Sequence, residues 1–541
     1  MSKVRKRPRD GAARPAGARD SAAKKARRKA ESAGGGAREK KHAAGPGSRA
    51  VEAPSGKIPS RPPPSYRLST CDTDEASAAS VLRPGDDEYE PCVRRAYAGF
   101  HVDPPDALTR ETHDAAAGAF ESMRALGLFH RDVLAAGNVV SPTFVRRVLV
   151  GDRGMTYHYQ KLRIFAHSWH DEDISDETDS GLDLSPLRVV RELNETLKAR
   201  SARVLKQTRR EDASANTDGS CDFNVTLINL MDAKAAASRS DVPLKDEARY
   251  GMGPTSVSWH SDSSLRPHST VAVYHVCFDE NGTSARDDSS WHVALRALDG
   301  RTPALRVPLP SRATYYMLRD FNAFHHHAVL AGNTRRYSST HRVAVVEKDT
   351  FEHIRRVCVD AVRSLPDLKR MAEARRRGVA RVDYAAHARL TRTLSDAHRE
   401  VEFQWIRMFW LQGEAHARAH AAYWRGKIDE LTQAWDAMEL GLRWALECLR
   451  LDARRAAGAA APSPPPRRNY DLASYALTAV AEAREAHFER ASSAAYAKLP
   501  ETHKPVRRPA FAETSPLPEN LRPAIAALAR WKARAERTRA T

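Results

Sequence analysis

The residues of this sequence that could share a metal ion are His260 and Asp262, which flank one residue in the stretch SVSWHSD. Side chains two residues apart on a β-strand point to the same face, so this imidazole and this carboxylate could bind one cation. His327, in the downstream stretch FHHHAVL, could complete a 2-His-1-carboxylate triad. That ligand set is typical of non-haem Fe(II), because it leaves positions open for dioxygen and a chelating acid.

A stripe of polar residues follows the histidines at strict two-residue spacing: Arg336, Ser338, Thr340 and Arg342. On a strand these four side chains would line one face. A buried arginine needs an anionic partner, and a dicarboxylate would give it bidentate, charge-assisted hydrogen bonds. The alternative is an exposed strand edge with paired charges, and the triad upstream is what favours the dicarboxylate.

Strands must position these residues, and the surrounding sequence predicts them. A β-rich block opens with DFNVTLINLM at 222–231 and runs to SSTHRVAVV, which ends at residue 346. Residues 270–276 alternate in hydrophobicity, and many short strands separated by turns indicate a sandwich or a barrel.

Two predicted helices and a predicted pair of strands precede this block. Apolar residues recur at helical spacing in 107–134 and 187–204. Residues 146–165 predict two short strands around a turn at Gly151–Gly154.

The character of the sequence changes after about residue 350, where strand patterns end and Ala, Arg, Leu and Glu dominate. We predict a helical C-terminal domain over 351–541 with a proline-rich loop at 461–468. Within 398–413, Val401, Trp405, Met408 and Phe409 form an aromatic stripe at helical spacing. Such a stripe is more often a buried core than a platform for stacking bases.

The positive charge of the chain is concentrated at its N-terminus. Residues 1–67 hold 19 Lys and Arg against 5 acidic residues, and the rest of the chain holds 68 against 63. We predict a disordered basic arm over 1–85, because it has few large apolar residues. The runs at 3–9 and 24–29 suit a nuclear-import signal or a tether to phosphate backbones, and a solubilising tail is the alternative.

The cysteine and hydropathy patterns exclude two other classes of protein. The six cysteines are far apart and form no CxxC pair, which suggests a reducing compartment without a disulfide framework. No apolar stretch reaches the roughly 20 residues that a membrane-spanning helix needs. We therefore expect no membrane partner, and a nuclear location with the cytoplasm as a second possibility.

Several blocks together resemble the family of the fat mass and obesity-associated protein, which are AlkB-related nucleic-acid demethylases. The blocks are NVTLINLMD, YGMGPTSVSWHSDSSL, WHVAL, FHHHAVLAGNTRRYSSTHRVA, RRVLVGDRGMTYHY and EVEFQWIRMFWLQG. The resemblance covers most of residues 90–500 and leaves out the N-terminal arm. It implies an α+β fold, with a double-stranded β-helix (jelly-roll) catalytic domain and flanking helices over 86–350, followed by the all-α domain.

The resemblance also implies roles for individual residues. Iron would bind His260, Asp262 and His327, with His325 as the fallback ligand because it shares the strand face. Arg336, Ser338 and Tyr315 would hold the distal carboxylate of 2-oxoglutarate, Asn229 and Arg342 its iron-chelating end, and Thr340 would line the same site. The methylated base would contact Arg147, Tyr157 and Tyr159, with Ser258 and Ser261 on the iron side.

Two positions depart from the family pattern at the expected base site. Ser263 stands where the family has a glutamate that contacts the base edge, and Gln160 replaces an apolar residue. A serine has neither the reach nor the charge of a carboxylate, so base preference could differ from N6-methyladenine. We expect the departures to affect the choice of substrate and not the binding of iron or 2-oxoglutarate.

The activity implied by the resemblance is oxidative demethylation of N-methylated bases, of the N6-methyladenine type, in single-stranded RNA or DNA. It would use Fe(II), 2-oxoglutarate and dioxygen, with ascorbate as reductant, and release formaldehyde, succinate and CO2. Three alternatives remain: a 2-oxoglutarate oxygenase of a protein or small molecule, a catalytically silent nucleic-acid-binding scaffold, and a zinc hydrolase. The last lacks an obvious general base and leaves Arg336 and Arg342 unexplained. The oligomeric state is left open.

Overall fold

The computed structural model describes residues 80–136, 139–159, 162–170, 183–208, 219–232, 244–286, 288–378, 383–457, 467–491 and 493–498. Most of the predicted basic arm, up to residue 79, lies outside these ranges, and so does the predicted proline-rich loop up to residue 466. No helix in the described part of the chain combines the length and the apolar character needed to cross a bilayer.

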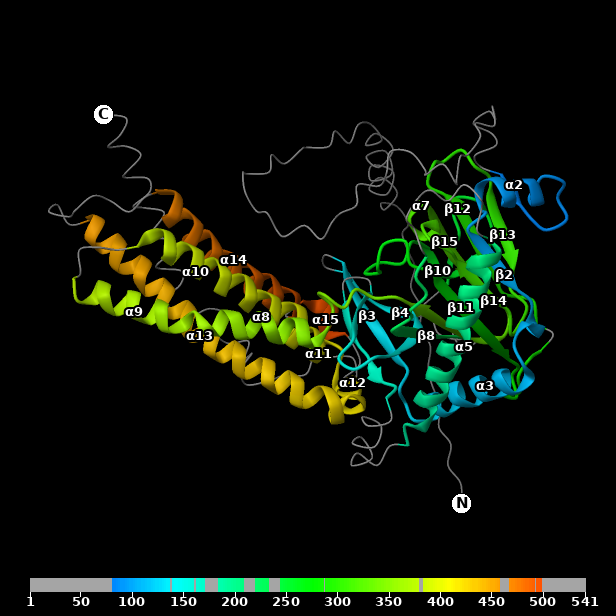
Figure 1. The fold of residues 1–541 in the computed structure, drawn as a ribbon, viewed down its shortest axis with the longest axis horizontal. Helices are drawn as coiled ribbons and strands as arrows, with labels where there is room; N and C mark the ends of the chain where they lie inside the picture. Colours follow the sequence, from blue (N-terminus) through cyan, green and yellow to red (C-terminus); the bar gives the residue numbers. More distant parts are fainter. Residues whose placement is uncertain are drawn as a thin grey trace, which may run out of the picture. The chain divides into compact units, whose positions relative to one another are not determined.

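The larger of two facing sheets has eight strands among the described residues, in the order β2-β14-β11-β16-β8-β4-β3, with β7 paired to β4 (Figure 1). Its strands are β2 (Phe100–Asp103), β3 (His130–Ala136), β4 (Val139–Gly151), β7 (His167–Ser168), β8 (Val225–Asp232), β11 (Val271–Phe278), β14 (Thr314–Met317) and β16 (Arg335–Arg342). All eight residues of β11 are buried. That burial is explained by cover on both faces of the sheet.

The smaller sheet has six strands among the described residues, in the order β1-β13-β12-β15-β10-β9. They are β1 (Val81–Leu82), β9 (Lys245–Asp246), β10 (Pro254–His260), β12 (His292–Ala297), β13 (Ala304–Pro308) and β15 (His325–Leu330). Val273 of β11 packs in one buried cluster with Val293 of β12 and Val329 of β15. The two sheets therefore form the predicted β-sandwich. The strands β5 (Thr156–Tyr159) and β6 (Leu162–Phe165) form a separate hairpin.

Helices cover the outer face of the larger sheet. Phe120 of α3 (Arg110–Ala125) and Leu193 of α5 (Ser185–Gln207) share a buried cluster with Tyr274 and Val276 of β11. The adjacent residues Val273 and Cys277 of β11 belong to the cluster between the sheets, as strand alternation requires. Shorter helices are α2 (Tyr89–Ala96), the 3-10 turn Pro105–Ala107 and α7 (Phe321–Phe324).

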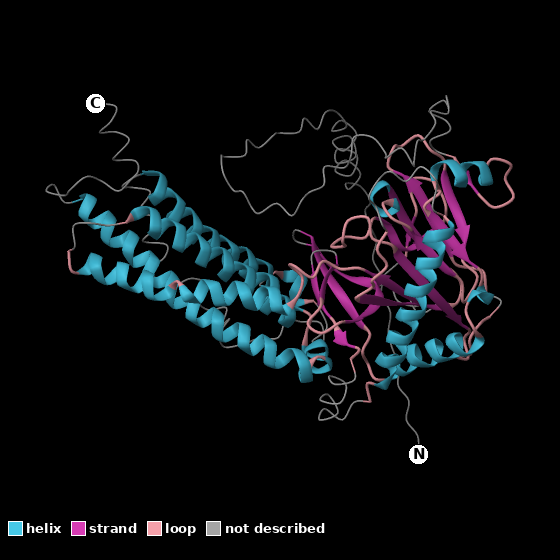
Figure 2. Cartoon of the chain, viewed as in Figure 1, coloured by secondary structure: helices cyan, strands magenta, loops and turns pink. Residues whose placement is uncertain are grey.

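The C-terminal region is helical in its described residues, in contrast to the sheet-rich region before it (Figure 2). Its helices are α8 (Phe351–Arg363), α9 (Leu365–Arg376), α10 (Tyr384–Arg399), a π-helix (Glu400–Ile406), α11 (Arg407–Leu411), α12 (Glu414–Ala419), α13 (Ala421–Ala457), α14 (Arg467–Ala491) and α15 (Ala494–Ala497). Val401, Trp405 and Phe409 are fully buried there, which confirms the core interpretation of the aromatic stripe. Met408 is half-buried. The helix expected over 398–413 is interrupted by the π-helix.

Two predicted elements have different limits in the structure. The helix predicted for 107–134 ends at Ala125, because Gly127 takes a positive φ of 75° that stops the helix, and β3 follows. The two short strands predicted for 146–165 are three: the end of the 13-residue β4, then β5 and β6. The helix predicted for 187–204 is confirmed as α5.

Candidate active site between the two sheets

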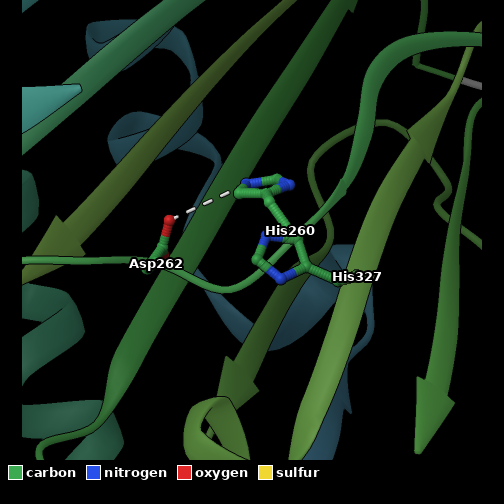
Figure 3. Close-up of side chains that lie close together, drawn as sticks. All are labelled: His260, Asp262 and His327. Atoms are coloured by element: carbon green, nitrogen blue, oxygen red, sulfur yellow. Dashed lines mark ion pairs between the residues drawn. The ribbon is translucent and has the colours of Figure 1, made fainter. Parts of the chain in front are cut away.

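His260, Asp262 and His327 meet where β10 ends beside β15 in the smaller sheet. His260 is the last residue of β10 and lies opposite His327 of β15 in the antiparallel register. The two imidazole centres are 4.1 Å apart, and His260 Nε2 lies 3.8 Å from Asp262 Oδ1 (Figure 3). One ligand atom from each residue lies within 4.8 Å of the others. The three side chains can therefore bind one metal ion.

Hydrogen bonds fix the orientation of two of these residues. His260 Nδ1 lies 2.8 Å from the carbonyl oxygen of Ser258, so it carries the proton and leaves the lone pair on Nε2. Asn322 holds the backbone of Asp262 with two hydrogen bonds: it accepts from the Asp262 N–H at 2.9 Å and donates to the Asp262 carbonyl at 2.8 Å. No spacing pattern in the sequence pointed to Asn322.

Electrostatics keep Asp262 ionised and His327 neutral. Burial raises the pKa of Asp262, but the charge of Arg342 and its hydrogen bonds to the carboxylate outweigh burial and lower the pKa to about 2. Burial, together with the neighbouring His260, lowers the pKa of His327 to about 3. An ionised carboxylate and neutral imidazoles are the protonation states that metal binding requires.

The structure separates the three consecutive histidines. His325 stacks on Phe321 with ring centres 4.0 Å apart, and its Nε2 lies 2.8 Å from the carbonyl oxygen of Ala96. His326 Nδ1 lies 3.0 Å from Arg296 Nη2. Only His327 faces His260, so the geometry favours His327 over the fallback His325 as the third ligand.

The six residues expected to bind 2-oxoglutarate lie on one face of the larger sheet. In β16, Arg336, Ser338, Thr340 and Arg342 are all buried. Asn229 of β8 is the cross-strand partner of Ser338, and Tyr315 of β14 lies opposite Val273, which itself lies opposite Thr340. Directly opposite residues share a face, so all six side chains point to the inner side of the sandwich.

Arg342 connects the two sheets. Its Nη2 and Nε donate to the two carboxylate oxygens of Asp262 at 2.7 and 3.1 Å. Each oxygen keeps a further lone pair, so this ion pair is compatible with metal binding by Asp262. The Arg342 guanidinium also lies 4.8 Å from the ring centre of Tyr157. Arg342 Nη1 is buried without a hydrogen-bond partner among the described residues.

Arg336 is a fully buried cation without a carboxylate partner among the described residues. Its Nε donates to His275 Nδ1 at 3.3 Å, its Nη1 lies 3.4 Å from the Met231 sulfur, and its Nη2 has no hydrogen-bond partner. Burial of Arg336 lowers its pKa. The pKa of His275 is held well below its usual value by burial and by Arg336, so His275 is neutral and can accept this bond. The spacing of the motifs did not point to His275, although it is a polar residue within an apolar strand.

Of the residues expected to contact the substrate, some are exposed beside the triad and others are buried. Ser258 and Ser263 are exposed, and the His260 side chain keeps 33% of its surface exposed, so the triad is open on one side. Ser261 donates to the carbonyl of His325 at 3.0 Å, and Ser263 donates to that of His158 at 3.3 Å. The side chains of Tyr159 and Gln160 lie outside the described residues.

Arg147 and Tyr157 are buried. Arg147 is 2% exposed, forms a bidentate ion pair with Asp132 and donates to Gln412 Oε1 of the helical region at 3.1 Å. Tyr157 is 3% exposed, and burial raises its pKa to about 12. Neither Asp132 nor Gln412 could be identified from spacing, because no local pattern relates either residue to Arg147.

Comparison with known proteins supports the assignment that these features suggest. The FTO catalytic domain model matches residues 87–345, and the FTO C-terminal domain model matches residues 349–530. A Xenopus laevis protein, alpha-ketoglutarate-dependent dioxygenase FTO, is 32% identical over 364 residues, which cover 61% of this chain and 69% of that protein.

Two solved structures are less similar to this chain. The structure of OsALKBH1 matches with 13% identity and a TM-score of 0.26, over 45% of this chain and 97% of that one. A 2OG-Fe(II) oxygenase family oxidoreductase from Burkholderia pseudomallei matches with 13% identity and a TM-score of 0.25, over 50% of this chain and 91% of that one. The family models and the Xenopus relative carry the assignment: the chain belongs to the FTO family of alpha-ketoglutarate-dependent dioxygenases.

Proposed function

We propose that this dioxygenase removes methyl groups oxidatively from N-methylated bases, of the N6-methyladenine type, in single-stranded RNA or DNA. In this proposal Fe(II) binds His260, Asp262 and His327. 2-Oxoglutarate, the other name of alpha-ketoglutarate, binds on the inner face of the larger sheet.

The observation that carries the co-substrate site is the unpaired guanidinium of Arg336. A buried cation is costly unless an anion compensates it, and the described residues offer Arg336 no carboxylate. The distal carboxylate of 2-oxoglutarate would supply that anion. Ser338 is on the same face of β16, and burial raises the pKa of Tyr315 to about 12, so its phenol keeps a proton to donate. Asn229 and Arg342 would hold the other end of the acid near Asp262, with Thr340 between them.

When bound, the Fe(II), 2-oxoglutarate and dioxygen supply an oxidation that hydroxylates the N-methyl group, which then leaves as formaldehyde, while the co-substrate becomes succinate and CO2. The residues of the chain orient these partners. Arg342 and Asn322 fix Asp262, and Ser258 fixes the tautomer of His260. The buried inner face of the larger sheet excludes water from the co-substrate.

The substrate class is supported by family membership and by the open side of the triad. The base would enter beside Ser258, Ser261 and Ser263, and a base in a duplex would have to leave the stack to reach the metal. Arg147, Tyr157 and Tyr159 would form its other side. Since Arg147 is bound to Asp132, we propose that it acts from within this ion pair. The basic runs of the N-terminal arm support nuclear import or a tether to the nucleic-acid backbone.

The test is mass spectrometry of single-stranded RNA and DNA oligonucleotides that carry N6-methyladenine or an N3-methylated pyrimidine. They are treated with the full chain, Fe(II), 2-oxoglutarate and ascorbate. We expect loss of the methyl group with equal amounts of formaldehyde and succinate. Asp262→Ala should reduce turnover to background, whereas Asp246→Ala, at an exposed position of β9, should leave it unchanged.

Two outcomes would contradict the proposal. Turnover that persists in Asp262→Ala would exclude the triad. If no methylated oligonucleotide stimulates succinate release but a protein or small-molecule fraction does, the chain oxidises another class of substrate.

A further inference from the structure

The outer face of the smaller sheet carries arginines that the described residues leave without an acidic partner. Leu295 of β12 and Leu305 of β13 belong to the buried cluster between the two sheets. Side chains alternate along a strand, so Arg296 and Arg306, the next residues of these strands, face outwards. Neither arginine forms an ion pair among the described residues. The strands can be followed in Figure 1 by the labels β12 and β13.

No helix supplies a residue to the apolar centre of this outer face in the described part of the chain. The centre is a small buried cluster formed by Met252, Ala294, Ala304, Ala328 and Leu330, which lie in strands and a loop. The outer face of the larger sheet, by contrast, is covered by α3 and α5. The arginines at the border of the small cluster are only partly buried, so they can reach a ligand in solution.

Arg306 lies beside another cation instead of an acid. The strand β1 pairs in parallel with β13, with Leu82 opposite Leu305, so the following residues, Arg83 and Arg306, are neighbours. Burial and the charge of Arg83 lower the pKa of Arg306. The Nε of Arg306 is buried and has no hydrogen-bond partner among the described residues. An anion would neutralise the two guanidinium groups and accept from the unmet donor.

Arg296 is stacked on an aromatic ring. Its guanidinium carbon lies 4.8 Å from the ring centre of Trp259, and its Nη2 donates to Nδ1 of His326 at 3.0 Å. The nearby carboxylate of Glu247 is used elsewhere: it accepts from Trp259 Nε1 at 2.9 Å and from the Tyr250 backbone N–H at 2.6 Å. Arginine binds phosphate through paired donors, and an aromatic ring offers a stacking surface to an unpaired base. The pair therefore suits a nucleotide.

This outer face adjoins the metal triad along two strands. Trp259 directly precedes His260 in β10, and His326 directly precedes His327 in β15. Because neighbouring residues of a strand point to opposite faces, the metal ligands lie on the inner side of the smaller sheet and these two side chains on its outer side. Nucleotides next to a base that enters the triad would therefore pass close to the outer face.

We propose that Arg83, Arg296 and Arg306, together with Trp259, form a docking face for the phosphate backbone of the single strand that carries the target base. The inference rests on the proposed function, because the nucleotides beside the target must lie near the triad. A single strand fits this face better than a duplex, since its bases are free to stack on Trp259. The arginines would hold phosphates without reading the base sequence.

The test measures binding of labelled, unmethylated single-stranded RNA and DNA of about 15 nucleotides to the full chain by fluorescence anisotropy over a series of salt concentrations. Each phosphate contact contributes about 0.7 to the slope of log affinity against log salt. The double variant Arg296→Gln/Arg306→Gln should therefore lower the slope by about 1.4 and weaken binding by about 25-fold at roughly 0.1 M salt.

Two further double variants show whether charge at this face is the cause. Arg389→Gln/Arg443→Gln removes the same charge from exposed positions of α10 and α13, and it should bind as the unchanged chain does. Arg296→Lys/Arg306→Lys keeps the charge at the face and should keep the salt slope.

Circular dichroism and thermal melting show whether each variant folds. If Arg296→Gln/Arg306→Gln does not fold, Arg296→Gln alone takes its place, because this side chain is partly exposed. The single variant should lower the salt slope by about 0.7.

The docking face is wrong if the folded glutamine variant binds both oligonucleotides with the affinity and salt slope of Arg389→Gln/Arg443→Gln. It is also wrong if the lysine variant loses the slope as the glutamine variant does. Tighter binding of polyglutamate than of either oligonucleotide, lost in the glutamine variant, would assign the face to an acidic protein instead.

Failure of the docking face and failure of the proposed demethylation give different results, because binding of unmethylated strands needs no turnover. If the chain demethylates oligonucleotides but the glutamine variant binds them as its control does, only the docking face is wrong. If the glutamine variant loses binding while the unchanged chain demethylates no oligonucleotide, the docking face holds and the proposed demethylation is wrong.

Discussion

Two buried charges, one in each region of the chain, have opposite surroundings. In the helical region, Glu402 is fully buried and accepts from Arg484 Nη2 at 2.8 Å, from Arg407 Nε at 2.9 Å and from Trp435 Nε1 at 2.9 Å. In the sheet region, Arg336 is just as buried, yet one guanidinium nitrogen has no partner among the described residues.

The difference separates charges that support the fold from charges that are kept for a ligand. A buried ion pair with complete hydrogen bonding stabilises the position of its helices once the fold has formed, and removing one partner is costly. A buried cation without an anion costs free energy in the unliganded protein, and it is retained only where a ligand compensates it. The following predictions test this comparison.

The largest effect on stability is expected at the paired charge. Glu402→Ala leaves Arg484 and Arg407 without their shared carboxylate, so the free energy of unfolding should fall by about 3–5 kcal/mol. Urea unfolding monitored by circular dichroism measures this free energy. A loss below about 1 kcal/mol would show that the network is not structural.

The opposite result is expected at Arg336, where a substitution should weaken co-substrate binding and leave stability intact. Arg336→Met should leave the stability of the unliganded chain unchanged or raise it, because it removes an uncompensated buried cation. It should raise the KM for 2-oxoglutarate about 100-fold, since losing one partner of a buried charge pair costs at least about 2–5 kcal/mol.

Arg335→Met is the matched control for Arg336. Arg335 precedes it on β16, and its Nη2 pairs with Glu121 of α3 at 2.8 Å on the opposite face of the sheet. The KM for 2-oxoglutarate should not change in this variant. If both variants raised the KM equally, the effect would reflect damage to the strand and not loss of a carboxylate contact.

A smaller effect is expected at the residue that holds Asp262. Asn322→Ala removes both hydrogen bonds to the Asp262 backbone, so Fe(II) affinity should fall about 10-fold, as is common for residues that orient metal ligands. Anaerobic titration with Fe(II) measures the affinity. Asn281→Ala, in an exposed turn, should bind iron as the unchanged chain does.

The last prediction concerns the pH dependence of stability, and each region has a matched histidine. Burial lowers the pKa values of His341 in β16 and His387 in α10 to about 3 in the folded chain. Below the unfolded value of about 6.5, the unfolded chain takes up a proton that the folded chain does not, so stability is lost as the pH falls from about 6.5 towards 3.

Replacing either histidine should therefore flatten the pH dependence of stability. His387→Asn and His341→Asn should each lower the slope by up to about 1.4 kcal/mol per pH unit between pH 6 and 4. Urea unfolding across this range gives the slopes. An unchanged slope in one variant would show that its histidine is already protonated in the folded chain.

Local spacing determined much of the site. Residues two apart on a strand share a face whatever the rest of the fold does, so the sequence alone aligned Arg336, Ser338, Thr340 and Arg342 of β16. The same rule suggested His260 with Asp262, but Asp262 lies beyond the end of β10, and Asn322 holds its backbone beside the histidines. The aromatic stripe of Val401, Trp405 and Phe409 was also recognised as core, since helical periodicity is local. The change from strand to helix patterns near residue 350 likewise separated the two regions.

Contacts between distant parts of the chain were decided only by the tertiary structure. The pairing of β10 with β15 places His327, and not His325, against His260, because the ring of His325 is bound by carbonyl groups of Phe321 and Ala96. The carboxylate of Asp132 and the amide of Gln412, which bind Arg147, could not be inferred from spacing either.

The sequence thus determined which side chains share a strand or helix face, since that follows from the geometry of one element. The tertiary structure decided which faces meet, since that depends on register and packing between segments hundreds of residues apart. Among the described residues it left Arg336 buried without a carboxylate partner, and it brought His130 to His416 and His167 to His420.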